Sequence, residues 1–225
     1  EAGGPQRLLS LQGAAGRPLR HLRVSGLTFA HTGFSFLDDS EPLLRSDWEI
    51  AREGAIFAEN TEDVRIADNE LTQLGGDAVF ASGYQRRLTV QGNHIHDIGG
   101  SAVSLVGRPE AVRSPSFRYE RFVAFDKLDR QPGPKTQDYP ANSRVEDNLI
   151  HDIGQTEKQS AGVQLSMAMD ITIAHNTIHD VPRAGINIGD GTWGGHVIEY
   201  NDVFDTVLET SDHGAFNSWG RDRFW

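Results

Sequence analysis

The 225-residue sequence contains no cysteine. Disulfide bonds, thiolate nucleophiles and cysteine-ligated metals are therefore excluded, whereas the cellular compartment is left open. Positive charge is also scarce, because 21 Lys and Arg stand against 32 Asp and Glu, for a formal net charge of −11. This balance disfavours nucleic acids and other polyanions as partners unless a metal intervenes. The sequence has no run of apolar residues long enough for a membrane span, so we expect none.

The chain begins at Glu1 without an initiator methionine or a signal peptide, as a processed form or a fragment would. Its length is enough for one hydrophobic core of ordinary size, and we expect residues 1–225 to form a single domain. The 24 glycines and 9 prolines indicate many turns and few long helices.

An internal repeat runs through most of the chain. Five segments share one pattern with an asparagine in the same place, separated by 24, 55, 28 and 25 residues: Asn69, Asn93, Asn148, Asn176 and Asn201. A unit of about 24 residues therefore repeats, with one large insertion. Asparagine suits a repeated corner because it tolerates left-handed backbone angles and can form hydrogen bonds along a stack.

An apolar column accompanies the asparagines, in segments such as "AVFAS" and "GINIG". Val79, Val103, Val163 and Ile186 align, and the next residue in each segment faces the other way: Phe80, Ser104, Gln164 and Asn187. Each unit holds three short strands joined by Gly, Asn and Asp turns, which is typical of a solenoid whose rungs stack and bury the apolar column. We predict an all-β fold, a right-handed parallel β-helix of about six rungs.

Two segments depart from the repeat. Residues 36–50 are expected to form a loop with one helical turn. Residues 108–142 are longer, carry five of the nine prolines, and are predicted to form an inserted loop or lid. Long insertions on solenoids often lie on the binding face, although this one could also simply pack on the solenoid.

The triplet "IHD" occurs three times and invites a metal-binding interpretation. His96, His151 and His179 occupy one column on successive rungs, and Thr72 and Phe204 take the same place in other rungs. We expect the preceding isoleucines to point inward, the histidines to stack outside, and the adjacent aspartates to accept hydrogen bonds from turn N–H groups. A stack tolerates such replacements more easily than a metal site does. No metal or other cofactor is therefore predicted, although Ca²⁺ is left open.

The repeat is least regular near the C-terminal end, where four extra residues enlarge the loop before the last strand. That loop carries Glu209, Asp212 and His213, and the preceding rung has the Gly-rich "GDGTWGGH" with Asp190, Trp193 and His196. We expect this Gly-rich loop to stack on the segment that holds Trp219, Arg221 and Asp222. Flat aromatic surfaces combined with carboxylates and polar side chains are typical of carbohydrate sites.

Glycoside hydrolysis uses two carboxylates about 5–10 Å apart. Asp190 and Asp212 are 22 residues apart, close to one rung. Asp190 follows its strand whereas Asp212 precedes the next one, so they can pair only if both loops fold over the same face. Otherwise Asp190 pairs with Asp222, and Asp212 with Glu209 or an acid of the insertion.

Three segments carry a resemblance to a known family. "SDWEIAREGAIF", "AGINIGDGTWGGHVIEYN" and "LETSDHGAFNSWGRDRFW" resemble glycoside hydrolase family 141, which includes α-L-fucosidase and xylanase activities. The "NxIHD" units look like the repeats of secreted bacterial right-handed β-helix proteins. The resemblance implies a carbohydrate-active β-helix, secreted or periplasmic, with Asp190 and Asp212 at acidic positions of the shared motifs. Relatives continue with more rungs, so we expect the chain to be part of a longer β-helix. Additional rungs, the insertion or another chain would then cover the strand edges at the C-terminal end.

Three functions follow as hypotheses. The first is a glycoside hydrolase that acts on plant or microbial oligo- or polysaccharides. Asp212 and Asp190 (or Asp222) would be its catalytic carboxylates, and His213 and Arg221 would orient them. The residues expected to contact the substrate are Asn187, Trp193, His196, Trp219, Arg221 and Asp222. A polysaccharide lyase would use Arg and Tyr of the insertion, but the negative net charge opposes an acidic polymer. A non-catalytic binding solenoid would present Trp193 and Trp219 with an outward platform of Gln164, Asn187 and Phe216.

Overall fold

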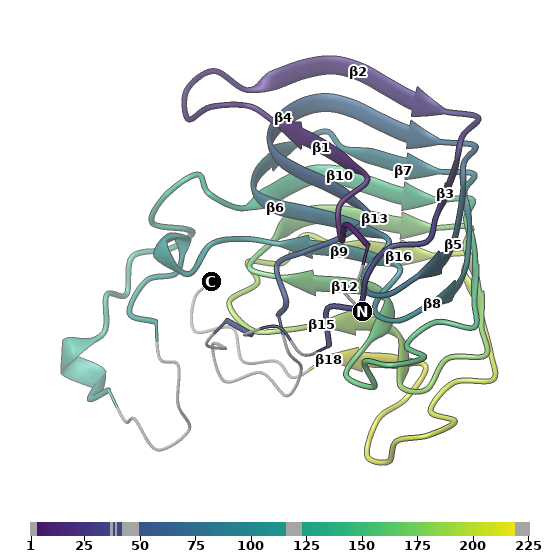
Figure 1. Ribbon diagram of the computed structural model, residues 1–225. Coiled ribbons are helices and arrows are strands. Elements are labelled where there is room, and N and C mark those ends of the chain that lie inside the picture. The colour runs from purple at the N-terminus through teal and green to yellow at the C-terminus, as the bar shows by residue number, and fades with distance from the viewer. Residues whose placement is uncertain (1–3, 37, 39, 42–49, 116–122, 219–225) are drawn as a thin grey trace.

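The computed structural model describes residues 4–36, 38, 40–41, 50–115 and 123–218. Within them, parallel strands stack into a solenoid (Figure 1). The larger sheet has the order β16-β13-β10-β7-β4-β6-β9-β12-β15-β18, with β1 and β2 also paired to β4. Its strands are β1 Leu9–Gln12, β2 Leu19–Ser25, β4 Ile56–Ala67, β6 Val79–Arg86, β7 Thr89–Gln91, β9 Val103–Val106, β10 Pro140–Glu146, β12 Ala161–Ser166, β13 Met169–Ala174, β15 Ala184–Ile188, β16 Val197–Glu199 and β18 Phe216–Ser218.

The smaller sheet runs in the order β17-β14-β11-β8-β5-β3. Its strands are β3 Thr28–Ala30, β5 Glu70–Leu74, β8 His94–Ile98, β11 Leu149–His151, β14 Thr177–His179 and β17 Asp202–Val203. Each rung contributes one strand to this sheet, so the part of the chain that the structure describes has six rungs. The predicted parallel β-helix and its approximate size are confirmed. No helix among the described residues is both long and apolar enough to cross a membrane.

The apolar column forms the core inside the solenoid. Val79 pairs with Val103, Val103 with Val163, and Val163 with Ile186, all in parallel register and all buried. Ile95, Ile150 and Ile178 also point inward and are fully buried. One hydrophobic cluster contains both columns and extends from Leu11 to Ile186. The period-2 alternation of the sequence thus decides which side chains enter this core.

The asparagine column forms a buried ladder at one corner. The side-chain Nδ2 of one asparagine donates to the carboxamide oxygen of the next at 2.9–3.0 Å, with Asn69, Asn93, Asn148 and Asn176 as the donors. The residues with left-handed φ, however, are those just before the asparagines: Asp68, Gly92, Asp147, His175 and Tyr200. The expectation that asparagine itself adopts this conformation is therefore wrong. Asparagine is instead favoured at this corner because its side-chain carboxamide forms hydrogen bonds along the stack and to backbone oxygens.

The histidine column stacks as predicted. The rings of His96, His151, His179 and Phe204 lie 4.9–5.2 Å apart, centroid to centroid, and are nearly parallel. The aspartates differ from expectation, because Asp97, Asp152 and Asp180 hydrogen-bond to Nδ1 of the histidine before them at 2.6–2.7 Å. These aspartates have positive φ, which turns each carboxylate back toward its own histidine.

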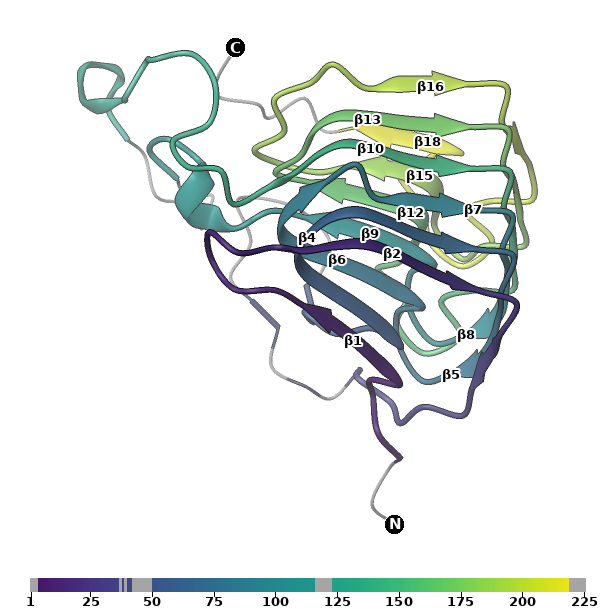
Figure 2. The same cartoon turned by 90° about the horizontal axis from the view of Figure 1, so that it is seen from above.

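The inserted segment lies to one side of the solenoid (Figure 2). Its described parts hold two short 3-10 helices, η1 Pro109–Ala111 and η2 Phe125–Lys127, and an ion pair between Arg113 and Asp129 at 2.7 Å. The insertion ends earlier than predicted, because Pro140 and Ala141 already pair with β6 as the start of β10. Most of the loop predicted for residues 36–50 lies outside the described residues.

Candidate functional site

The outer face of the larger sheet carries a second column, made of Phe57, Phe80, Ser104, Gln164 and Asn187. All five side chains are buried, because other segments cover this face. Asn217 donates to Asn187 at 2.6 Å and Asn187 donates to Gln164 at 2.8 Å, which continues the column into β18. Gln164 and Asn187 therefore form no open platform. Phe216 is misplaced in that hypothesis, since it pairs with Ile186 of the apolar column.

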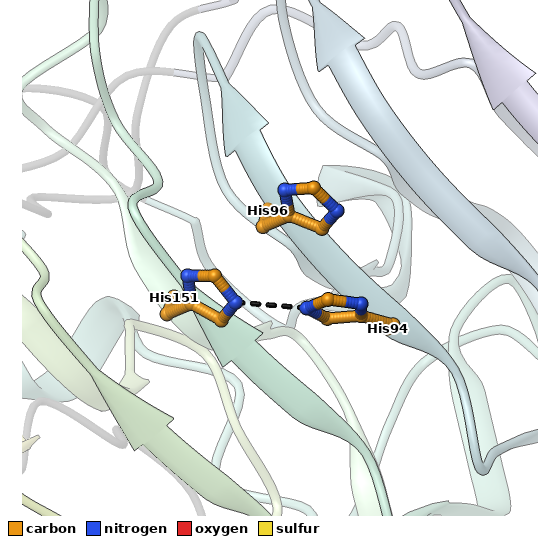
Figure 3. Close-up of side chains that lie close together, drawn as sticks. All are labelled: His94, His96 and His151. Carbon is orange, nitrogen blue, oxygen red and sulfur yellow. Dashed lines mark hydrogen bonds between the residues drawn. The ribbon is translucent and has the colours of Figure 1, made fainter.

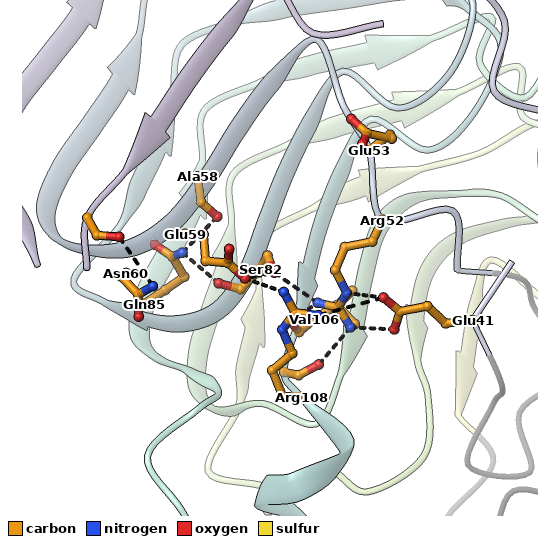
Figure 4. Close-up of polar contacts among 12 residues, drawn as sticks. Glu41, Arg52, Glu53, Ala58, Glu59, Asn60, Ser82, Gln85, Val106 and Arg108 are labelled. Carbon is orange, nitrogen blue, oxygen red and sulfur yellow. Dashed lines mark hydrogen bonds and ion pairs between the residues drawn. The ribbon is translucent and has the colours of Figure 1, made fainter. Parts of the chain in front are cut away.

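Arg52, which lies just before β4, connects Glu41 to the outer face of the larger sheet (Figure 4). Its guanidinium forms an ion pair with Glu41 and donates to Ser82 Oγ, Val106 O and Gly107 O, each at 3.1 Å. Burial would raise the pKa of nearby Glu59, but hydrogen bonds from Arg108 and Ser82 and the charge of Arg52 hold it below its usual range. The charges of this network are paired, so we assign it a structural role.

A different pair of acids meets where the strands of this sheet begin. Asp77 precedes β6 and accepts hydrogen bonds from Ser101 N and Ser104 Oγ, both at 2.6 Å. Burial and the neighbouring charge of Glu157 raise the pKa of Asp77 well above its usual range. A buried carboxyl group whose pKa is raised beside a second carboxyl group is a candidate general acid.

Glu157 reaches Asp77 from a loop two rungs away. Its N–H donates to Gly99 O at 2.8 Å, and its carboxylate accepts from Ser35 Oγ at 2.5 Å. A Cβ atom on Gly76 would lie 2.1 Å from Ser35 Oγ, so this close approach requires glycine there. The Glu157 loop borders a cavity of about 200 Å³, whose other lining residues include Ser35, Phe36, Asp38 and Lys158.

The sequence prediction missed this pair because Asp77 and Glu157 are 80 residues apart and only the stacking of rungs brings them together. One signal was available in the repeat. The position of Asp77 is occupied by Ser101 and Ala161 in the following rungs, so Asp77 is an acid in an otherwise small, uncharged column.

Asp212 and His213 lie at the same end of the sheet as Asp77, several rungs further along. Asp212 is exposed with a φ of +69°, and His213 Nε2 accepts from Nε of the buried Arg183 at 3.2 Å. Glu209 of the same loop forms an ion pair with Lys158 at 2.8 Å.

Asp190 lies at the other end. It is buried two residues beyond β15, whereas Asp212 stands four residues before β18, and these neighbouring strands are parallel. The structure thus does not bring Asp190 and Asp212 together, because the enlarged loop does not fold across the strand between them. Trp219, Arg221 and Asp222 lie outside the described residues, and so does any pairing of Asp190 with Asp222.

Trp193 and His196 have structural contacts. The Trp193 ring lies 4.8 Å from the Tyr139 ring, centroid to centroid, and packs against the buried cluster of Ala111, Tyr139 and Ala141. His196 Nδ1 accepts from Ile171 N at 3.1 Å, and burial lowers the pKa of this histidine. Both residues connect the Gly-rich loop to its neighbours, while their predicted contact with substrate stays a prediction.

Side chains suited to metal binding occur elsewhere, on the outer face of the smaller sheet. Among the described residues, one group of three fits, namely His94, His96 and His151, with ligand atoms within 4.8 Å of one another.

Comparison with known proteins agrees with this architecture. A solved structure named "Glycoside hydrolase" superposes with a TM-score of 0.69 at 17% identity, over 96% of this chain and 40% of that one. A structure of XylC in complex with xylose gives a TM-score of 0.50 at 15% identity, over 82% of this chain and 29% of that one. The chain therefore spans less than half the length of either protein, and at these identities the likeness shows the fold alone. No curated protein matches the sequence. The family described as "Right handed beta helix region" matches residues 51–223, most of the chain, and the protein therefore belongs to the right-handed β-helix family.

Proposed function

We propose that the chain is the β-helix of a glycoside hydrolase in which Asp77 is the general acid and Glu157 the second carboxylate. The observation that carries this proposal is the raised pKa of buried Asp77 beside Glu157, whose loop borders a cavity. Glycosidases need one protonated and one ionised carboxyl group across the scissile bond, and their environments set these states apart.

The chemistry divides between the two groups. Asp77 gives its proton to the glycosidic oxygen as the bond to the anomeric carbon breaks. Glu157 stabilises the positive charge that develops on the sugar and either activates a water molecule or attacks the anomeric carbon. The Glu157 charge also raises the pKa of Asp77, which favours the protonated form that a general acid needs.

The surroundings favour a sugar as the ligand. Phe36 is half exposed on the cavity wall, where an aromatic face can stack on a pyranose ring. The volume of about 200 Å³ is below the ~300–1,000 Å³ of drug-sized pockets, which suits one sugar unit. The similar structures named for a glycoside hydrolase and for a xylose complex lead us to test xylosides first.

Two of the residues predicted from the sequence to be catalytic, Asp212 and His213, take a substrate-binding role in this proposal. Asp212 and His213 stand at the same end of the sheet as Asp77, where they would contact neighbouring units of an oligo- or polysaccharide. Asp190 at the opposite end does not enter this scheme. The resemblance to family 141 adds α-L-fucosides to the substrates worth testing, and a polysaccharide substrate would suit a secreted or periplasmic protein.

Two isosteric variants test the assignment on aryl xylosides, aryl α-L-fucosides and xylan. We expect Asp77→Asn and Glu157→Gln each to lower kcat/KM by about 10²–10⁴-fold, the usual contribution of acid–base catalysis, with unchanged circular dichroism. Glu199→Gln, which removes an exposed acid of β16 that does not line the cavity, should keep wild-type activity. Full activity of Asp77→Asn together with loss of activity in Asp212→Asn would overturn the Asp77–Glu157 assignment and support the prediction made from the sequence.

Two other outcomes would favour the alternative functions. Sugar binding without turnover would favour the binding solenoid, and an unsaturated product absorbing in the ultraviolet would favour the lyase.

A further inference from the structure

We propose that His94, His96 and His151 form a binding site for a divalent first-row transition metal, of which zinc is the representative, on the outer face of the smaller sheet. The three rings come from two neighbouring strands, β8 and β11 (Figure 3). One ring nitrogen of each residue lies within 4.8 Å of the others, and all three side chains are half-buried. The site is independent of the proposed sugar site.

The repeat explains only part of this cluster. His96 and His151 are directly paired members of the stacked histidine column. His94 belongs to a different column, in which its neighbours on adjacent rungs are Glu70 and Leu149. Since residues two apart on a strand share a face, His94 and His96 both stand on the outside of β8. The third imidazole therefore adds a potential ligand that the stack itself does not need.

Carboxylates already hold two of the rings in the form that binds a metal. Asp97 and Asp152 each lie 2.7 Å from Nδ1 of His96 and His151, and a carboxylate accepts a proton rather than donating one. Nδ1 therefore carries the hydrogen and Nε2 keeps its lone pair. Metal-binding histidines in proteins commonly have this carboxylate–histidine arrangement, which fixes the tautomer and strengthens the ligand.

The nitrogens that point toward the site have no better partners. His96 Nε2 is buried without a hydrogen bond among the described residues, and its nearest charged neighbour is Glu70 Oε1 at 3.6 Å. His94 and His151 face each other through Nε2 atoms 2.8 Å apart.

Rotation and displacement of the imidazole rings separate this arrangement from a coordination sphere, because the His96 and His151 rings are stacked with an interplanar angle of 11°. With metal–nitrogen bonds of about 2.0–2.1 Å, two ligands of a tetrahedral ion lie about 3.4 Å apart. The Nε2 atoms of His94 and His151, now 2.8 Å apart, must therefore separate by about 0.6 Å, and ligand atoms up to 4.8 Å apart must approach by up to about 1.4 Å. The proton between them moves to Nδ1 of His94, which frees both Nε2 lone pairs without net release. Glu70, on the preceding rung, is placed to become the fourth ligand.

The ligand set defines the class of metal. Three imidazoles with one carboxylate suit Zn²⁺, Co²⁺, Ni²⁺ or Cu²⁺ and not the oxygen-seeking Ca²⁺ or Mg²⁺. Such an ion would connect β8 with β11, and through Glu70 with β5. It would link three consecutive rungs and stabilise the folded state, because the unfolded chain lacks the preformed site.

The test is titration of the full, untagged chain with ZnCl₂ by calorimetry, and with CoCl₂ by visible absorption, which reports the ligand geometry. We expect one ion per chain and a melting temperature raised by about 5–10 °C at a zinc concentration about a hundred times Kd. His94→Gln should weaken zinc binding about 100-fold or more, and Asp152→Asn about 10–100-fold through loss of the orienting carboxylate.

His179→Gln is the matched control, because His179 stacks on His151 and bonds to Asp180 in the same way but lies outside the cluster. It should bind zinc as the unaltered chain does. Absence of binding in the unaltered chain would overturn the proposal, and so would equal losses in His94→Gln and His179→Gln. His151→Gln gives an independent second variant, and circular dichroism without metal verifies that each variant folds.

Discussion

Asp77 is the residue in which the fold and the proposed chemistry conflict. Burial and the Glu157 charge disfavour its ionised form, while the hydrogen bonds from Ser104 and Ser101 favour that form. The first two effects prevail, so the pKa is raised. Ionised Asp77 therefore destabilises the folded chain, a common cost of an acid that is kept protonated for catalysis.

This conflict makes the stability of the chain depend on pH. Because the folded-state pKa lies above the unfolded value of about 3.9, the folded state holds the proton more tightly. The stabilisation is fully present below about pH 4 and is lost as the pH rises through the folded-state pKa, by about 1.4 kcal/mol for each unit of elevation. Asparagine mimics the protonated form, so Asp77→Asn should leave the melting temperature unchanged below about pH 4 and raise it at neutral pH.

Melting curves across this range check the expectation, and a double-mutant cycle identifies the cause. In a Glu157→Gln background the neighbouring charge is gone, so Asp77→Asn should stabilise the chain less than it does alone. A melting-temperature difference that is the same at every pH would contradict the elevated pKa of Asp77.

Among the structural elements, the asparagine corner shows how one side chain can connect three rungs. Asn148 accepts from both the backbone and side-chain N–H of Asn93 at 3.0 Å, and it donates to Val90 O and Asn176. Asn148→Ala leaves several of these buried groups without partners, at about 1–3 kcal/mol for each. We expect a loss of about 2–4 kcal/mol in unfolding free energy, measured by urea denaturation.

The matched variant is Asn201→Ala at the end of the ladder. Asn201 is only partly buried, and its neighbours reach water more easily. Its loss should cost about 1 kcal/mol. Equal costs at the two positions would mean that the ladder does not depend on burial.

The sequence predicts those elements whose cause is local and repeated. The valine column and the asparagine ladder were predictable because each rung imposes the same inward and corner positions. The left-handed position was assigned one residue too late, since Asp68, Asp147 and Asn have similar turn preferences and periodicity cannot tell neighbouring residues apart. The end of the insertion was misplaced because Pro140, a usual strand breaker, begins β10.

The candidate sites were harder to predict because they combine different columns or distant loops. Asp77 and Glu157 meet through a loop that reaches back toward an earlier rung, which no spacing in the sequence encodes. His94 stands beside a predicted column without belonging to it. Asp190 and Asp212 were chosen because their loops break the repeat, but the parallel register of β15 and β18 keeps them apart.

At the scale of the whole molecule, the continuous core raises the question of whether the solenoid unfolds as one unit. One cluster of buried side chains extends through the rungs, and each rung contacts mainly its neighbours. Leu71 in β5 and Ile178 in β14 are both fully buried within it, three rungs apart in the smaller sheet. Repeat proteins of this length unfold cooperatively when the interfaces between rungs are strong compared with the stability of a single rung.

We expect a single cooperative unit, in agreement with the prediction of one domain. Leu71→Ala and Ile178→Ala should each lower the unfolding free energy by about 2–5 kcal/mol, the usual cost of such a cavity. In hydrogen exchange followed by mass spectrometry, Leu71→Ala should then accelerate the slowest exchange in β5 and in β14 alike, since both open only by global unfolding. If acceleration stays confined to the rungs beside Leu71, the two ends unfold separately. In that case the Asp77–Glu157 pair and the Arg183–His213 pair would lie in regions of different stability.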